Sequence, residues 1–160
     1  MNWKTLPPHS RVWIYQSNRE FSDAEVNEIN QKANEFVANW GSHGKELQAA
    51  IEVFHNRFVV VFVDEQHTSA SGCSIDKSVH FMQQMEKDYG INLFDRMQVA
   101  YVDDEEIKTS HLNELKALSF EEGLGETPIF NNLVATKAEF ETNWEVPLKD
   151  SWLADNVLSS

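Results

Sequence analysis

The sequence contains a single cysteine, Cys73, among its 160 residues. One cysteine cannot form a disulfide within the chain, so nothing in the composition indicates an oxidising compartment. No apolar run approaches the roughly 20 residues that a helix needs to cross a bilayer. The first ten residues lack the apolar segment of a signal peptide. We therefore expect a cytoplasmic protein, with residues 1–160 forming one domain large enough to bury a core.

Basic side chains are scarce in this chain. It carries 13 lysines and arginines against 26 aspartates and glutamates, which gives a formal net charge of −13. The imbalance is strongest after residue 100, and no arginine follows Arg96. A field of this sign disfavours nucleic acid and anionic membranes as partners, although the same charge also serves simple solubility.

Phosphate-binding and metal-binding motifs are also missing. Gly44-Lys45 is followed by Glu46 rather than by serine or threonine, so the chain has no P-loop. The sequence contains no G-x-G-x-x-G, G-x-S-x-G or H-E-x-x-H pattern, and the six histidines have no compact ligand spacing. We expect neither a metal ion nor a cofactor.

The clearest strand signal is the unbroken apolar run at residues 58–63, which is typical of a strand buried on both faces. Residues 12–15 form a shorter run of the same kind. Residues 47–55 and 97–103 alternate between apolar and polar side chains, which predicts half-exposed strands. His55-Asn56 provides a tight connection, so residues 47–55 and 58–63 are predicted to form a hairpin.

Two helices are predicted between these strands. Ser22 and Glu25 form a capping box, followed by apolar side chains at helical spacing as far as Trp40. Ser74 is predicted to cap the second helix, which should end before Gly90.

Residues 11–103 therefore follow the order βαββαβ, the order of an α+β ferredoxin-like domain. In this interpretation the first and third strands are adjacent, parallel and central. An unrelated α+β sheet with the same element order remains the alternative. Further helices are predicted at residues 110–122 and from Thr136 to Trp144, so the ferredoxin-like core would carry additional C-terminal helices.

This topology would bring both helix starts to one edge of the sheet. The residues expected there, as a ligand-binding set, are Arg19, His43, Lys45, Ser74, Asp76 and Arg96. Helix N-termini and basic side chains attract anions, so we expect a small anionic ligand at this edge. The alternative is a purely structural edge, with Arg19 in an inert ion pair to Asp76 or Asp95.

Cys73 has two interpretations. Near a helix N-terminus and an arginine, its thiol would be the nucleophile of a thiol-dependent enzyme. Otherwise it is a small residue whose thiol points into the core between Val63 and Val79. The phosphatase pattern C-x5-R fails, because position 79 is valine. We expect the buried, structural role.

Three blocks of the sequence are familiar in combination: VWIYQSNREFSDAE at 12–25, ASGCSID at 70–76, and residues 128–144 with Ser151-Trp152. Together they resemble a family of short, uncharacterised bacterial proteins, many of which carry the label of ABC-transporter ATPase. This chain has no Walker A motif, so that label does not fit it. The resemblance implies a small cytoplasmic protein and supplies no activity.

The sequence therefore favours a non-catalytic ligand-binding or regulatory protein with an anion-accepting edge. A thiol-dependent enzyme using Cys73 is one alternative. The other is a structural interaction module that uses its acidic C-terminal face. A protein partner or homodimer could then form through the tryptophans near the termini or through an edge strand.

Overall fold

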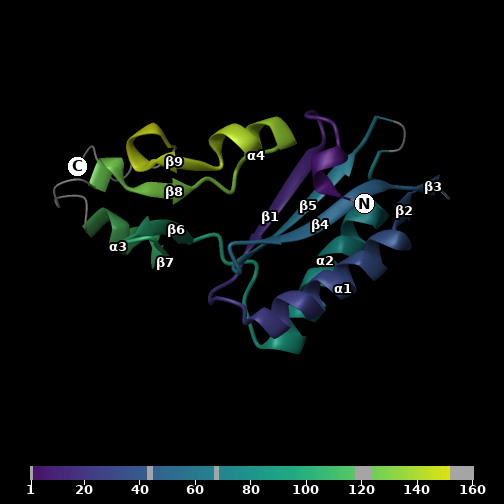
Figure 1. Ribbon diagram of the computed structural model, residues 1–160, viewed down its shortest axis with the longest axis horizontal. Coiled ribbons are helices and arrows are strands. Elements are labelled where there is room, and N and C mark those ends of the chain that lie inside the picture. Colours follow the sequence, from purple (N-terminus) through teal and green to yellow (C-terminus); the bar gives the residue numbers. More distant parts are fainter. Residues whose placement is uncertain (1, 43–44, 67–68, 118–123, 152–160) are drawn as a thin grey trace.

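A computed structural model gives the structure of residues 1–160 and describes all of them except 1, 43–44, 67–68, 118–123 and 152–160 (Figure 1). The first sheet is antiparallel, with strand order β1-β5-β4. Its strands are β1 (Arg11–Gln16), β4 (Gln48–Phe54) and β5 (Phe58–Asp64). Helices α1 (Asp23–Ala38) and α2 (Gly72–Tyr89) cover one face of this sheet, below it in Figure 1.

A second antiparallel sheet has strand order β7-β6-β8-β9. Its strands are β6 (Gln98–Asp103), β7 (Glu106–His111), β8 (Pro128–Phe130) and β9 (Glu145–Pro147). The remaining regular elements are helices α3 (Leu112–Ala117) and α4 (Lys137–Asn143), the short β2 (Gly41–Ser42) and β3 (Lys45–Glu46), and four-residue or shorter 3-10 turns. The protein is thus a mixed α+β structure, as the sequence predicts. None of the helices in the described part of the chain is long and apolar enough to cross a membrane.

β5 is buried on both faces, which confirms the prediction from its apolar run. Val59, Val61 and Val63 join the core beneath α1 and α2. The alternate side chains of β5, led by Phe58 and Phe62, join a second core that includes residues of β8 and α4. This second core is rich in aromatic rings, and Trp3, Phe140 and Trp144 pack there against the side chains of the sheet.

The strands at residues 12–15 and 58–63 are adjacent, as predicted, but the predicted parallel pairing is wrong. β1 runs antiparallel to β5, with Ile14 opposite Val60. The cause is topological. The crossover through α1 returns the chain so that β4 runs parallel to β1, and the tight hairpin then reverses it. β5 inserts between the two strands and must oppose both.

The predicted fourth strand exists as β6, but it does not lie beside β1. It pairs with β7 over its whole length and with β8 at Tyr101 and Ile129. β1 is therefore at the edge of a three-stranded sheet, and the predicted central position of β1 is wrong. The four-stranded ferredoxin-like arrangement is not confirmed.

Local signals at the helix ends are largely confirmed. Ser22 and Glu25 form the predicted capping box at the start of α1. Gly90 ends α2 with a φ of 61°, a left-handed conformation that glycine adopts without steric cost. The predicted cap of α2 is wrong by three residues, because Ser71 occupies the cap and accepts the backbone N–H of Ser74.

The C-terminal part differs more from the prediction. Thr136 caps α4 as predicted, whereas β7 and β9 were not predicted at all. The helix predicted at 110–122 begins at Leu112, and its later part lies outside the described residues. Trp144 is buried in the aromatic core, and Trp3 stacks on Phe62 with ring centroids 5.1 Å apart. These tryptophans pack the chain onto itself rather than forming a docking surface; Trp152 lies outside the described residues.

Candidate functional site

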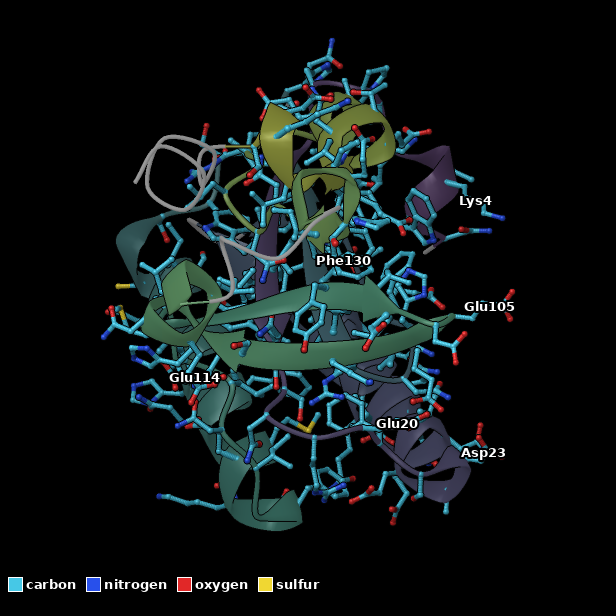
Figure 2. All side chains as sticks on the ribbon, turned by 90° about the vertical axis from the view of Figure 1, so that its left-hand side faces the viewer. Lys4, Glu20, Asp23, Glu105, Glu114 and Phe130 are labelled. Carbon is cyan, nitrogen blue, oxygen red and sulfur yellow. The ribbon has the colours of Figure 1, made fainter. Side chains whose placement is uncertain are left out.

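A cavity of about 100 Å³ lies where the two sheets meet. Its walls come from β1, from the segment between α2 and β6, and from the residues that follow β8. Most of the lining is apolar, and it includes the buried Phe130, which is labelled near the centre of the view in Figure 2. The lining residues are Ile14, Gln16, Leu93, Asp95, Arg96, Gln98, Val99, Phe130, Asn132 and Leu133.

A chain of hydrogen bonds holds the polar wall of this cavity. Trp144 Nε1–H donates to Asn132 Oδ1 at 3.0 Å, Asn132 Nδ2 donates to Gln16 Oε1 at 2.9 Å, and Gln16 Nε2 donates to the Gln98 carbonyl at 3.2 Å. Because an indole N–H can only donate, Trp144 sets the direction of every amide in the chain. The carboxamides of Asn132 and Gln16 are therefore locked in place before any ligand arrives.

Arg96 lies at this cavity as an exposed side chain. Its guanidinium makes no hydrogen bond or ion pair with any residue that the structure describes. It lies near enough to Tyr15 to affect that phenol: burial raises the pKa of Tyr15, and the positive charge of Arg96 opposes the rise. The neighbouring Asp95 carboxylate is partly engaged, since it accepts the backbone N–H of Met97 at 2.9 Å.

Arg19, predicted as a ligand residue, is instead a structural clamp. Its guanidinium forms a two-pronged pair with Glu25, at 2.9 and 2.8 Å. It also donates to the carbonyls of Glu20 at 3.0 Å and Tyr89 at 2.7 Å. These contacts tie the loop after β1 to the last turn of α2 and use the donors that a ligand would need.

The other predicted ligand residues lie around the start of α2. Ser74 is buried, and its Oγ donates to the Gly41 carbonyl at 2.7 Å. Asp76 is exposed and follows the first turn of α2. Lys45 belongs to β3, with its side chain outside the described part, and His43 lies outside the described residues altogether.

The structure therefore does not bring the predicted set into one site. Arg19 contacts Tyr89 at the end of α2, whereas Ser74 lies in its first turn. Fifteen residues of helix separate these positions by about 22 Å. The antiparallel pairing of β1 and β5 explains the separation, because α1 then starts at one end of the sheet and α2 at the other. Of the predicted residues, Arg96 alone lines the inter-sheet cavity.

Cys73 lies in the first turn of α2 and is exposed. The expectation that its thiol points into the core is wrong. The helix begins two residues earlier than its predicted cap, and this shift turns position 73 outward. In the described part of the chain its Sγ has no hydrogen-bond partner. A search of the same residues for groups of three or more histidine, cysteine, aspartate or glutamate side chains with metal-binding geometry finds none.

Sequence reasoning missed Gln16, Gln98, Asn132 and Leu133. The one local signal among them is Gln16, a glutamine that ends an apolar strand and is nevertheless buried. The others come from segments far apart in the sequence, and only the packing of the second sheet against β1 brings them together.

Comparison with known proteins finds no relative: no family model, curated protein or solved structure matches the chain.

Proposed function

We propose that this protein is a non-catalytic binding protein for a small ligand that carries a carboxylate and a short apolar group. The ligand would occupy the inter-sheet cavity. The observation that carries the proposal is Arg96, whose guanidinium lies at the wall of a largely apolar cavity and has no hydrogen-bond or ion-pair partner among the described residues.

The chemistry of the walls supports this choice. Small-molecule sites are typically apolar hollows with a few fixed polar groups, and here Gln16 and Asn132 are fixed by their own hydrogen bonds. Arginine is well suited to a carboxylate, because its planar fork donates two parallel hydrogen bonds. In a chain of net charge −13, an anion would otherwise be repelled, so the attraction must be local to Arg96.

The size of the cavity limits the ligand. A dry protein cavity of about 150 Å³ accommodates benzene, so about 100 Å³ accommodates roughly four non-hydrogen atoms. A branched three- or four-carbon group fits inside, with the carboxylate at the mouth beside the exposed Arg96.

The ferredoxin-like interpretation belongs to the same proposal. β1, α1, β4, β5 and α2 correspond to the first five elements of that fold, with the sheet order that this correspondence requires. The fourth strand of such a sheet would lie along the free edge of β1. Here β6 belongs to the second sheet, and Ile14 and Gln16 of β1 line the cavity.

A thiol-dependent enzyme is less well supported. A cysteine nucleophile is activated by a base within hydrogen-bond reach or by neighbouring positive charge, and none of the described side chains forms a hydrogen bond or ion pair with Cys73. The exposure of the thiol satisfies only the requirement that a substrate can reach it.

Titration with isovalerate, followed by amide chemical shifts, tests the proposal. We expect shifts at Ile14, Gln16 and Gln98, and Arg96→Gln should weaken binding at least tenfold. Arg11→Gln is the matched control, because it removes an arginine of β1 that lies outside the cavity and pairs with Glu65. Equal loss in both variants, or shifts that avoid the cavity, would show that Arg96 does not hold the ligand.

A further inference from the structure

β1, whose residues Ile14 and Gln16 line the cavity, lies at the edge of its sheet. At its start, the backbone N–H of Val12 points away from β5 and donates to the Ala135 carbonyl at 3.0 Å. Since alternate residues of a strand direct their backbone groups to the same side, Ile14 and Gln16 present their N–H and C=O groups to that same edge. Residues 135–136 cover the edge only at Arg11 and Val12.

Beyond Val12, none of the described residues pairs with this edge. In the described part of the chain, the backbone N–H and C=O groups of Ile14 and Gln16 form no hydrogen bond on this side. Both residues are nevertheless buried and line the cavity. Buried backbone groups are almost always paired, so this edge favours a ligand that supplies its own amide groups.

The surroundings of the cavity are unusual for this surface. Among the described residues, the large hydrophobic side chains that stand exposed are Leu133, at 63%, and Met97, at 46%. Leu133 lines the cavity, and Met97 lies between the lining residues Arg96 and Gln98. Apolar side chains beside an open strand edge, together with an arginine that has no partner among the described residues, are typical of a peptide-binding surface.

We propose that the ligand is the C-terminal residue of a peptide, which binds as a short additional strand along β1. This proposal rests on the proposed function and identifies its ligand class. The terminal carboxylate pairs with Arg96, and the backbone pairs with Ile14 and Gln16. A branched side chain such as that of valine fills the cavity, and the preceding residues leave it past Leu133 and Met97. The peptide thereby takes the place of the fourth strand in a ferredoxin-like sheet.

Charge and shape favour this occupant over an internal peptide segment. An internal segment brings no carboxylate to Arg96, and a cavity of about 100 Å³ accepts only one small side chain. A chain terminus supplies the anion, the side chain and an amide N–H within a single residue, and the preceding residues supply further amide groups.

The test compares acetyl-Ala-Ala-Val with isovalerate, which has the same branched chain and carboxylate but no amide. We expect the peptide to bind at least fivefold more tightly, in keeping with the net value of one or two backbone hydrogen bonds. Replacement of the terminal carboxylate by an amide should abolish this binding. Two further peptides carry a single N-methyl group, one at the valine and one at the preceding alanine. They should differ in affinity, because only one of two successive N–H groups can face β1.

A protein variant provides an independent readout. Ile14→Pro removes an N–H that makes no bond to β5, and proline is tolerated on an edge strand. Compared with Ile14→Ala, it should lower the ratio of the peptide's affinity to the affinity of isovalerate. If isovalerate binds and the peptide binds no better, or both methylated peptides bind equally well, the strand-addition proposal is wrong while the proposed function stands. If neither ligand binds, both are wrong. Should Ile14→Pro fail to fold, the methylated peptides still decide.

Discussion

The guanidinium of Arg19 holds the carboxylate of Glu25 in parallel hydrogen bonds of 2.9 and 2.8 Å. Glu25 also accepts the backbone N–H of Ser22 at 2.9 Å, so one carboxylate closes both the helix cap and the clamp onto α2. The hydrogen bond from Arg19, followed by that from Ser22, lowers the pKa of Glu25 to about 2 from its ordinary value of 4.5. The negative charge of Glu25 is therefore part of what holds this end of the molecule together.

The first prediction concerns acid stability. Because the pKa of Glu25 is lower in the folded state, its contribution to stability is fully present above pH 4.5 and is lost as the pH falls toward 2. The stability of Glu25→Gln should therefore change less than that of the unaltered protein as the pH falls from 4.5 toward 2. Urea midpoints measured from neutral pH to pH 2 give the comparison. Glu28→Gln, an exposed position of the same helix, is the control and should retain the pH dependence of the unaltered protein; the same profile in both variants would contradict the prediction.

The start of α1 could be predicted because a capping box is local. Ser22, Glu25 and the apolar spacing that follows lie within a few residues, and no distant contact changes their meaning. The start of α2 was harder to predict. Ser71 and Ser74 are both suitable caps, and the choice depends on Gly41, a residue far away in sequence that engages the Ser74 hydroxyl.

The position of β1 shows why the site itself could not be predicted. Its apolar run correctly indicates burial, but burial on both faces does not distinguish a central strand from an edge strand covered by a second sheet. The polar residues of the cavity come from three segments whose proximity depends on where β6 and β8 pair. Only Arg96 was identified, on a topology that proved wrong in strand direction.

Ser74 gives the second prediction. Its Oγ donates to the Gly41 carbonyl at 2.7 Å, and its own carbonyl accepts the indole N–H of Trp40 at 2.9 Å. Ser74→Ala leaves the Gly41 carbonyl without this donor in a buried setting, so we expect a loss of about 1–3 kcal/mol in the free energy of unfolding. Ser69→Ala, at an exposed position in the preceding loop, should have little effect. Indistinguishable urea midpoints for the two variants would show that the bond to Gly41 contributes nothing.

The exposed thiol of Cys73 gives the third prediction. Iodoacetamide should modify Cys73 in the folded protein, without denaturant, because the side chain is already at the surface. Cys73→Ser should change the free energy of unfolding by no more than about 0.5 kcal/mol, as for other surface substitutions. Mass spectrometry of the labelled protein and urea unfolding provide the measurements. Labelling that required denaturant would contradict the exposed position, whereas labelling at pH 6.5 much faster than that of free cysteine would favour the thiol-dependent enzyme.

The last prediction concerns Arg57, which joins the two sheets at the end of the molecule opposite the start of α2. Its guanidinium donates to the carbonyls of Ser17 at 3.4 Å and Asn18 at 3.1 Å, and to the carbonyl of Ile107 in β7 at 3.3 Å. Burial lowers the pKa of Arg57 and the charge of Glu20 opposes this, but an arginine stays protonated throughout the range in which proteins are folded. Its charge is therefore shared among two carbonyls of the loop after β1 and one carbonyl of β7 in the second sheet.

Arg57→Ala should leave these carbonyls without their donor and cost about 1–3 kcal/mol in the free energy of unfolding. Hydrogen exchange should accelerate in β6 and β7 more than in β5, because the second sheet loses one of its attachments to the first. Arg57→Lys should recover only part of the loss, since an ammonium group cannot reach carbonyls spread across the arginine fork. Lys108→Ala is the matched control: it removes a cation from β7 whose pair with Asp103 is exposed, and it should cost less than about 1 kcal/mol. If Arg57→Ala and Lys108→Ala had equal effects on both stability and exchange, Arg57 would not be what fastens the second sheet to the first.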